Sequence, residues 1–494
     1  MSKKDKQELR QQIACEWLHE NYLQFGNLRH DVVTDRLQIK AYPQPLPEGR
    51  GVSAAQKSFP LGEDLGEAMY WRNLTDKDIN TMVCQCVAES GVNISVTEMW
   101  TALKSDMVPA VHPLRAWLDG LRPYTADQPD WIDFVAQQVH VKNNNAECGI
   151  NKDNLNNLCA RPTLALAKED ISPLSQQQSV SSPLSNVGEA EELSMLSSEQ
   201  TNPLSLQDSL ADTLWRACFK KWFVAMVASW MKDEVVNHTV LVLVGRQGIY
   251  KTTWLDHLIP PALRPYSSKL PLSGQISKDD RLRLCENGML NIDELDAICG
   301  REMNIMKSLL TSTDINERAA YGRLKERKVR LASFCASTNK REFLTDITGN
   351  RRWLPFEVES IQNPFYTTLP YEMMYAQAVY LVQNDFNYWF DMDEIEVMEQ
   401  HNEEFRAQEN EEQLLPILFD IPAEGKGEFM TTAEISERLV TYGNIKKPMK
   451  TRQLGMLMAK KGFQKKQVFL SGTNVRGWMV YNRQIDEIKL AKNI

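Results

Sequence analysis

The sequence contains no run of apolar residues that approaches the roughly 18 to 20 needed to cross a membrane, so we expect no membrane partner. Its nine cysteines are scattered, and the close pair Cys84 and Cys86 has no second pair at zinc-ligand spacing. A disulfide framework and a zinc site are therefore not expected, and the cysteines are predicted to be reduced thiols of a cytoplasmic protein. The charged, amphipathic N-terminal segment is also unlike a signal peptide.

The chain also lacks an excess of positive charge. Its net charge of −9 at pH 7 argues against a protein that coats nucleic acid with its whole surface. The charges are unevenly distributed, because residues 391–412 are rich in acids whereas residues 444–483 contain lysines and arginines but no acid. A local basic surface suffices for contacts with DNA phosphates, so we expect DNA to bind near the C-terminus.

The length of 494 residues, with 43% apolar and 24% charged residues, predicts a soluble, multidomain globular protein. The composition divides it into a mostly helical N-terminal domain (1–145), a Ser- and Asn-rich flexible linker or insert (146–207), a central α/β domain (208–415) and a C-terminal domain (425–485).

Local patterns predict several elements of these domains. Residues 30–42 are typical of a strand pair, and helices are expected at 76–88 and 95–105, with Asp76 and Ser95 as N-caps. A strongly helical segment at 209–232 carries aromatic residues at a spacing more typical of a core than of a base-stacking platform. Further helices are expected at 371–384 and 392–408, the latter with a solvated or partner-facing acidic face.

The most informative segment is LVLVGRQGIYKTT at residues 241–253, in which an apolar strand leads into a glycine-containing loop. Glycines allow backbone N–H groups to surround phosphate oxygens, and a following helix directs its positive end at the same anion. We expect this loop to bind ATP and Mg²⁺, with Lys251 on the β- and γ-phosphates and Thr252 on the metal. The predicted ATP-binding residues are Gly245, Gly248, Lys251, Thr252 and Thr253.

The phosphate loop departs from the G-x-x-x-x-G-K-[ST] pattern at one position, because Tyr250 stands where glycine is expected before Lys251. A decayed or accidental loop is the alternative interpretation. Asp293 and Glu294 count against it, since they follow the apolar segment 289–292 as the Mg²⁺-binding and catalytic acids of such ATPases do.

Two further groups of polar residues follow in order. Asn339 ends another apolar segment, where an amide can position the attacking water. Arg351 and Arg352 precede the apolar segment 354–358, and an arginine there can reach the γ-phosphate held by a neighbouring subunit. Either arginine taken alone is more typical of a surface salt bridge, and the complete order of the motifs is what favours the catalytic interpretation.

This order of motifs resembles the superfamily 3 helicases of viruses and phages, which are hexameric AAA+-like ATPases. The residues more closely resemble the virulence-associated protein E family of phages and mobile elements. The matching segments are GRQGIYKTTW, NIDELD, ERAAYGR (317–323), CASTN (335–339) and GNRRW (349–353), with HPLRAWLDGL (112–121) upstream. The likeness covers residues 70–140 and 208–415. It implies a central AAA+-like P-loop ATPase in which Asp293 binds Mg²⁺, Glu294 and Asn339 are catalytic, and Arg351 or Arg352 acts in trans.

The same resemblance implies a DNA-contacting hairpin before the Asn339 segment. The basic stretch RAAYGRLKERKVR (318–330) lies there, and Arg323, Lys325 and Arg327 are the candidate contacts. A solvated charged face is an equally good interpretation of these residues.

The C-terminal domain shows the pattern helix, turn, helix, hairpin, which predicts a winged helix. Thr431 and Thr432 precede one helix, residues 449–463 form a second, and VFLSGTNVRGWMVY alternates across a turn like a wing. The candidate DNA-binding residues are Lys450, Arg452, Lys460 and Lys461. A winged helix that binds protein, with a solvated basic face, is the alternative.

These observations together predict a DNA-dependent ATPase, either a superfamily 3-like helicase or a replication initiator of a prophage or mobile element. It is expected to bind ATP, Mg²⁺ and DNA and to form a homo-oligomeric ring, a hexamer by resemblance. Two alternatives stay open. One is a P-loop switch in regulation or phage defence that hydrolyses ATP without unwinding DNA, and the other is a DNA-binding scaffold without enzymatic activity.

Overall fold

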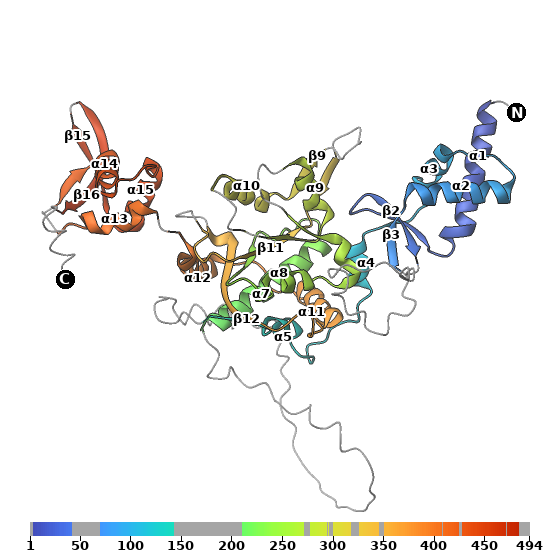
Figure 1. The fold of residues 1–494 in the computed structure, drawn as a ribbon, viewed down its shortest axis with the longest axis horizontal. Coiled ribbons are helices and arrows are strands. Elements are labelled where there is room, and N and C mark those ends of the chain that lie inside the picture. The colour runs from blue at the N-terminus through green and yellow to red at the C-terminus, as the bar shows by residue number, and fades with distance from the viewer. Residues whose placement is uncertain are drawn as a thin grey trace, which may run out of the picture.

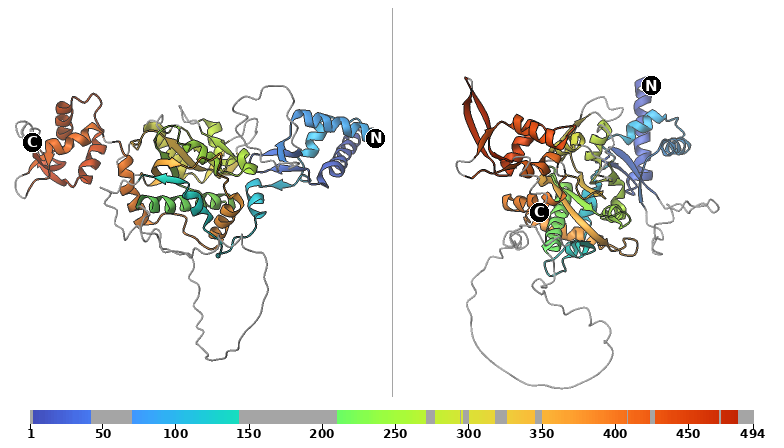
Figure 2. Two further views of the ribbon diagram at one scale, coloured as in Figure 1. Left: turned by 60° about the horizontal axis from the view of Figure 1, so that its bottom comes forward. Right: turned by 60° about the vertical axis from the view of Figure 1, so that its left-hand side comes forward.

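The computed structural model describes residues 3–41, 70–142, 210–270, 277–293, 295, 300–317, 326–344, 350–407, 409–423, 427–470 and 472–483. They form a multidomain α/β protein in which a central body lies between the N-terminal elements at one end and the C-terminal elements at the other (Figure 1 and Figure 2). No helix within the described residues is both long and apolar enough to cross a membrane.

The N-terminal elements combine helices with a small sheet. They are α1 (Lys3–Leu18), the π-helical turn η1 (His19–Leu23), β1 (Leu28–Asp31), β2 (Arg36–Ala41), β3 (Tyr70–Asn73), α2 (Asp76–Ser90), α3 (Val96–Leu103) and β4 (Ala110–Val111). The strands form a sheet in the order β3-β2-β1-β4. The predicted strand pair is confirmed as the β1–β2 hairpin, and among the described residues of this region helix exceeds strand, as expected of the predicted mixed, mostly helical domain.

Capping explains where the N-terminal helices begin. Ser95 caps α3 as predicted, in a capping box with Glu98. The N-cap of α2 is Thr75 rather than Asp76, and Asp78 completes its capping box. The predicted helix is therefore confirmed, while the predicted N-cap is wrong by one residue because a threonine at this position also accepts an N–H bond.

The central body is built on a six-stranded sheet in the order β5-β12-β6-β11-β8-β7. The strands are β5 (Val139–Val141), β6 (Val240–Val244), β7 (Ser267–Lys269), β8 (Met289–Ile292), β11 (Ser333–Thr338) and β12 (Trp353–Ile361). All neighbours are parallel except β5, which pairs antiparallel with β12. The central strand β6 reads VLVLV and is buried throughout, as expected of a parallel strand covered on both faces.

The connections of this sheet supply the remaining elements of the body. They are α7 (Leu210–Met231), α8 (Lys251–His257), η2 (Pro261–Tyr266), α9 (Lys278–Glu286), α10 (Gly300–Thr311), the hairpin β9 (Asp314–Glu317) and β10 (Glu326–Val329), η4 (Asn350–Arg352), α11 (Tyr371–Gln383), α12 (Met392–Asn402) and η5 (Glu403–Phe405). Helix α7 confirms the predicted aromatic core, since Trp215, Phe219, Trp222, Phe223 and Trp230 are all buried.

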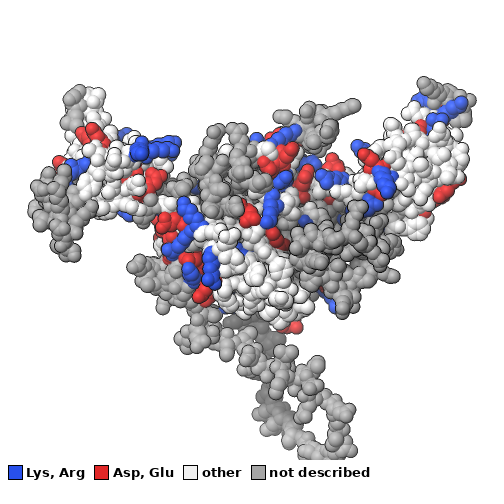
Figure 3. All heavy atoms as spheres, viewed as in Figure 1, with Lys and Arg blue, Asp and Glu red and all other residues white. Residues whose placement is uncertain are grey.

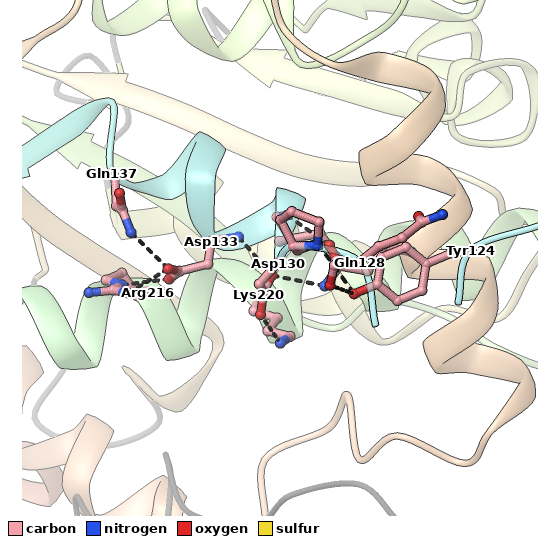
Figure 4. A network of polar contacts seen from close by, with 10 residues as sticks. Tyr124, Gln128, Asp130, Asp133, Gln137, Arg216 and Lys220 are labelled. Carbon is pink, nitrogen blue, oxygen red and sulfur yellow. Dashed lines mark hydrogen bonds and ion pairs between the residues drawn. The ribbon is translucent and has the colours of Figure 1, made fainter. Parts of the chain in front are cut away.

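The segment that precedes residue 143 belongs structurally to the central body. Helices α4 (Pro113–Asp119) and α5 (Trp131–Ala136) and strand β5 share one hydrophobic cluster with α7 and the sheet. Polar contacts fix this segment in place (Figure 4): Asp130 caps α5 and accepts hydrogen bonds from Lys220 and Gln377 at 2.6 and 2.8 Å, while Asp133 pairs with Arg216. Burial raises the pKa of Asp130, but the charge and hydrogen bond of Lys220, together with the hydrogen bonds from the Asp133 N–H and Gln377, outweigh that effect and the net shift is downward.

The acidic residues at 391–412 are not uniformly solvated, contrary to the sequence-based expectation. Glu394 of α12 is buried and accepts hydrogen bonds from Lys221 of α7 at 2.7 and 2.8 Å. Glu412 is also buried and forms a two-pronged ion pair with Arg406. A carboxylate can be buried when a cation and its hydrogen bonds accompany it. A local sequence pattern does not reveal either pair, because Lys221 is 173 residues from Glu394 and Arg406 is six residues from Glu412, which is not a helical spacing.

The C-terminal elements are α13 (Asn410–Leu418), β13 (Phe419–Asp420), β14 (Glu428–Met430), α14 (Thr432–Gly443), α15 (Thr451–Lys460), β15 (Gln464–Leu470) and β16 (Thr473–Asn482). The predicted order of two helices and a hairpin is confirmed. Thr431 caps α14 in a capping box with Glu434. Buried Leu454, Leu457 and Met458 turn one face of α15 toward the core of this region.

Candidate functional site

Polar side chains gather at the carboxyl edge of the parallel sheet, where β6, β8 and β11 end. Parallel strands present such an edge to ligands where the chain order reverses, and β6 is that point here, with β11 on one side and β12 on the other. The loop after β6 is attached to its neighbour strand because Gly245 N–H donates to the carbonyl of Thr338 at 3.1 Å. The residues predicted as a phosphate loop therefore lie beside the end of β11.

The conformation of this loop depends on glycine at two positions. Gly248 has φ +88°, which favours a residue without a side chain. A Cβ on Gly245 would lie 2.8 Å from the carbonyl oxygen of Val358 on β12, too close for any substitution without displacement. Tyr250 adopts φ +66°, the left-handed region, immediately before α8. It thus takes the backbone conformation of the glycine that it replaces in the motif.

Lys251 is 7% exposed and points its ammonium group back into the loop. Its Nζ donates to the carbonyl oxygens of Gly245 and Arg246 at 2.7 and 2.8 Å, and to Oδ1 of Asn339 at 3.0 Å. The structure therefore brings two of the predicted residues, Lys251 and Asn339, into direct contact from different strands.

Thr252, Asp293 and Ser337 form an oxygen cluster beside the lysine. Thr252 Oγ1 lies 3.2 Å from Asp293 Oδ1 and 2.8 Å from Ser337 Oγ, and Ser337 Oγ donates to Asp293 Oδ1 at 3.2 Å. Such hard oxygen donors suit Mg²⁺, which takes one or two carboxylates and completes its shell with water and substrate phosphates. The described residues contain no group of three or more His, Cys, Asp or Glu that could hold a metal by itself.

Lys269, at the end of β7, is a member of this site that the sequence did not identify. Its Nζ lies 3.0 Å from Asp293 Oδ2. Burial raises the pKa of Asp293, but the hydrogen bond and charge of Lys269, together with the hydroxyls of Ser337 and Thr252, lower it by more. Asp293 is therefore held as a carboxylate, the form in which it can bind a cation.

Ser337 was also missed, although a sequence signal for it exists. Alternate residues of a strand share one face, and Ser337 lies two positions before Asn339, which directly follows β11, so this spacing is the signal for a second polar residue at the same strand end. A second polar pair joins β8 to α8, where Asn291 Nδ2 donates to Asp256 Oδ1 at 2.7 Å. Burial raises the pKa of Asp256 against the opposing effects of Asn291 and Lys269.

The remaining predicted residues of this centre lie elsewhere or outside the described part of the chain. Thr253 is half-buried on α8, next to Thr252, and Glu294 lies outside the described residues. Arg351 and Arg352 form the turn η4 at the amino end of β12, where Trp353 pairs with Val240 at the start of β6. They are therefore at the edge of the sheet opposite Lys251.

The arginine turn is fixed by α12. Asn402 Nδ2 donates to the carbonyl oxygens of Asn350 and Trp353 at 2.9 and 3.0 Å, one on each side of the two arginines. Arg351 is exposed and Arg352 half-buried, and burial followed by the charge of Arg351 lowers the pKa of Arg352. The neighbouring guanidinium groups of Arg351 and Arg352 therefore concentrate positive charge at the edge of the sheet opposite Lys251.

The candidate DNA-binding residues separate into different environments. Arg323 and Lys325 lie outside the described residues, and Arg327 on β10 donates to Asp314 at 2.6 Å. Lys460 pairs with Glu403 at 2.6 Å and Lys461 with Glu412 at 3.5 Å, so both ammonium groups face acids of the η5 and α13 region. These three cations are engaged within the protein.

Lys450 and Arg452 lie at the exposed start of α15, beside a hollow between that helix and the β15–β16 hairpin. The hollow has a volume of about 690 Å³. Its charged lining residues are Arg452, Lys465, Lys466 and Arg476, and none of the described residues that line it is acidic. On the face drawn in Figure 3, Lys and Arg side chains of the central body lie intermixed with Asp and Glu side chains.

Comparisons with known proteins bear on the central body. Three solved apo structures of the C-terminal region of NrS-1 are similar to this chain, at 10%, 10% and 11% identity and TM-scores of 0.38, 0.39 and 0.36. Each covers 94% of this chain and 99% of its own. No curated protein matches the chain. Residues 203–407 match the model of the virulence-associated protein E-like domain, the family that the sequence motifs resemble.

Proposed function

We propose that this protein is a DNA-dependent ATPase, a superfamily 3-like helicase or replication initiator of a prophage or mobile element. The observation that carries the proposal is the convergence of Lys251, Thr252, Asp293, Ser337 and Asn339 at the carboxyl edge of the sheet. They come from β6, β8 and β11 and their following loops, and their chemistry is that of a site for Mg²⁺ and a nucleoside triphosphate.

Each residue has a role that its contacts support. Lys251 would exchange its carbonyl partners for phosphate oxygens of ATP, because an anion is the better acceptor for an ammonium group. Thr252, Ser337 and Asp293 would hold Mg²⁺, which neutralises charge on the phosphates. Asn339 can orient the attacking water without adding charge, since its amide lies 3.0 Å from Lys251. Glu294 is proposed as the acid that accepts the proton of that water.

The position of the arginines supports an oligomeric enzyme. Four strand steps separate Val240 from Val244 in β6, which places η4 roughly 13 Å or more from the phosphate loop at about 3.3 Å per step. Arg351 and Arg352 therefore cannot reach a phosphate on Lys251 of their own chain, but they can reach one bound to a neighbour. Contacts between opposite edges are head-to-tail, and such contacts form a ring when the rotation between copies closes, here proposed as a hexamer.

The C-terminal hollow supports the DNA part of the proposal. A helix and a hairpin flank it, as in a winged helix, and four cations without an acid line it. Lys465 Nζ also lies 5.2 Å from the ring centre of Trp478, so an aromatic surface and a basic surface adjoin. DNA phosphates are the proposed ligand of these cations, with Lys450 and Arg452 at the entrance.

The test of the ATPase is hydrolysis by the full chain with and without single-stranded DNA. We expect Lys251→Ala to abolish activity and the matched surface variant Lys278→Ala to retain it. Arg351→Ala and Arg352→Ala are tested separately, and the active arginine is the one whose loss abolishes turnover. Mixing that variant with Lys251→Ala should restore part of the activity, because each supplies what the other lacks.

Two outcomes would favour the alternatives. Hydrolysis that depends on Lys251 but is unaffected by DNA would indicate a P-loop switch. Equal affinity of wild type and Lys251→Ala for ATP would indicate a DNA-binding scaffold without enzymatic activity.

The test of the DNA surface is binding over a series of salt concentrations. Lys465→Ala and Arg476→Ala should each lower the affinity and reduce the salt dependence by about one counterion. Lys460→Ala is the matched control, because its charge is already paired with Glu403. Equal effects of all three substitutions would contradict the proposed surface.

A further inference from the structure

The tyrosine within the phosphate loop occupies an unfavourable backbone conformation. Tyr250 has φ +66°, and a non-glycine residue held there loses about 1–2 kcal/mol relative to a right-handed conformation. Strained residues of this kind concentrate at functional sites. The ring of Tyr250 does not offset the strain by entering a core, because the residue is 38% exposed.

The Tyr250 side chain instead contacts the segment that follows β12. Its hydroxyl accepts a hydrogen bond from Asn363 Nδ2 at 3.4 Å, and its ring lies edge-on to Phe365 with the centres 6.3 Å apart. Asn363 also shapes that segment, since its Oδ1 accepts from the N–H of Phe365 and its carbonyl from the N–H of Tyr366. The loop and the segment after β12 are thus joined through Tyr250.

We call four residues the aromatic ledge: Tyr250, His257 and Phe365, whose rings adjoin, and Tyr366, the chain neighbour of Phe365. His257 of α8 lies edge-on to Phe365 at 5.8 Å. Phe365 is 40% exposed and Tyr366 is 89% exposed. Two large aromatic side chains that are open to solvent at adjacent positions, beside a third ring on the phosphate loop, form an apolar surface of the kind that a ligand covers.

The ledge lies on the same edge of the sheet as the phosphate loop. Strand β12 is in register with β6 up to Glu357 opposite Val244, and it continues to Ile361 beyond the point where β6 ends. The segment with Phe365 and Tyr366 therefore starts past the carboxyl edge. Tyr250 is the chain neighbour of Lys251, so a ligand with phosphates at Lys251 can extend its other end onto the ledge.

We propose that the aromatic ledge binds the nucleobase of the nucleotide whose phosphates are held at Lys251, an inference that rests on the proposed nucleotide site. Every base has a π-face, and stacking on aromatic rings tolerates any base while favouring the larger purines. Stacking alone reads no hydrogen-bond pattern, so ATP and GTP should bind with similar affinity. Tyr250 then has a function in the loop, which explains why a residue other than glycine is tolerated there.

The test compares two Mg²⁺-bound ligands by calorimetry, ATP and inorganic tripolyphosphate, which lacks the base. Tyr366→Ala and Phe365→Ala should each weaken ATP binding roughly 5- to 100-fold, the range of one lost base–aromatic stack, without changing the affinity for tripolyphosphate. Tyr366→Phe keeps the ring and should bind ATP as wild type does. Unchanged ATP binding in both alanine variants, with Lys251→Ala weakening both ligands, would overturn the ledge but leave the nucleotide site intact.

A second variant tests the ledge through the backbone. Tyr250→Gly restores the residue of the motif and is compatible with φ +66°, so folding is not at risk. We expect it to weaken ATP binding while the affinity for tripolyphosphate is unchanged. Tighter ATP binding by Tyr250→Gly would show that the ring obstructs the site. Loss of single-stranded DNA binding in Tyr366→Ala, with unchanged ATP binding, would assign the ledge to DNA. Either outcome overturns the proposal. If Lys251→Ala changes neither ligand, the nucleotide site itself is refuted.

Discussion

Arg330 offers a demanding prediction about stability, because it is buried without a carboxylate partner in the described part of the chain. Its guanidinium donates to the carbonyl oxygens of Leu309 and Leu310 at 3.0 and 2.7 Å, of Asn237 at 2.8 Å, and of Ala332 at 3.1 Å. The first two belong to the last turn of α10, whose negative end favours a cation. One side chain therefore joins α10, the approach to β6 and the start of β11.

The substitution Arg330→Met keeps apolar bulk but removes all these donors. Four buried carbonyl oxygens then lose a hydrogen bond, and at about 1 kcal/mol each the unfolding free energy should fall by about 4 kcal/mol. For a domain of about 150 to 250 residues, this loss of unfolding free energy corresponds to a Tm lower by roughly 8 to 16 °C. The buried tryptophans of α7 and the sheet make thermal unfolding measurable by intrinsic fluorescence.

The matched control is Arg327→Met, which removes an exposed arginine from the same basic stretch. Its ion pair with Asp314 lies at the surface, where such pairs contribute about 0–1 kcal/mol. Equal Tm values for the two variants would refute the reasoning, because the burial of Arg330 would then have no energetic consequence.

Three further predictions concern the proposed site. Ser337→Ala should raise the Mg²⁺ concentration needed for half-maximal hydrolysis, since it removes an oxygen beside Asp293, and an unchanged requirement would exclude Ser337 from the metal site. The lowered pKa of Asp293 means that its carboxylate stabilises the fold above its ordinary pKa and that this contribution is lost as the pH falls through the lowered value. Lys269→Ala should therefore move the acid limb of the pH–activity profile to higher pH, and a limb that does not move would contradict the pairing. Gly245→Ala should abolish ATP binding measured by calorimetry, because its Cβ would meet a backbone carbonyl of β12 at 2.8 Å, whereas wild-type affinity would show that the loop shifts freely.

Local patterns in the sequence predicted much of the fold, because their causes are local. The capping boxes at Ser95 and Thr431, the β1–β2 hairpin, the aromatic core of α7 and the two helices with a hairpin at the C-terminus follow from neighbouring residues. The position of Lys251 beside Asn339 follows as well, since parallel strands end at the same edge.

The partners of individual charges could not be predicted in this way. Arg327 and Arg330 are separated by only two residues, yet one is at the surface and the other is buried, a difference set by α10 and by the residues before β6. Lys460 of the C-terminal domain is likewise paired with Glu403, which lies in the predicted central domain, so no local pattern reveals that ion pair. Strand β5 falls within the predicted N-terminal domain although it pairs with β12 of the central sheet. Its short sequence does not indicate this partner, which is more than two hundred residues away.

The two ends of the sheet have a consequence for how much of this protein a cell needs. On the proposed function, with Lys251 at one end of the sheet and the trans arginine of the pair Arg351 and Arg352 at the other, an isolated copy would hold nucleotide without consuming it. Turnover would then rise more steeply than in proportion to the number of copies, because each productive event needs two of them. Low basal expression would leave ATP untouched, and a burst of synthesis would itself act as the signal that starts the reaction.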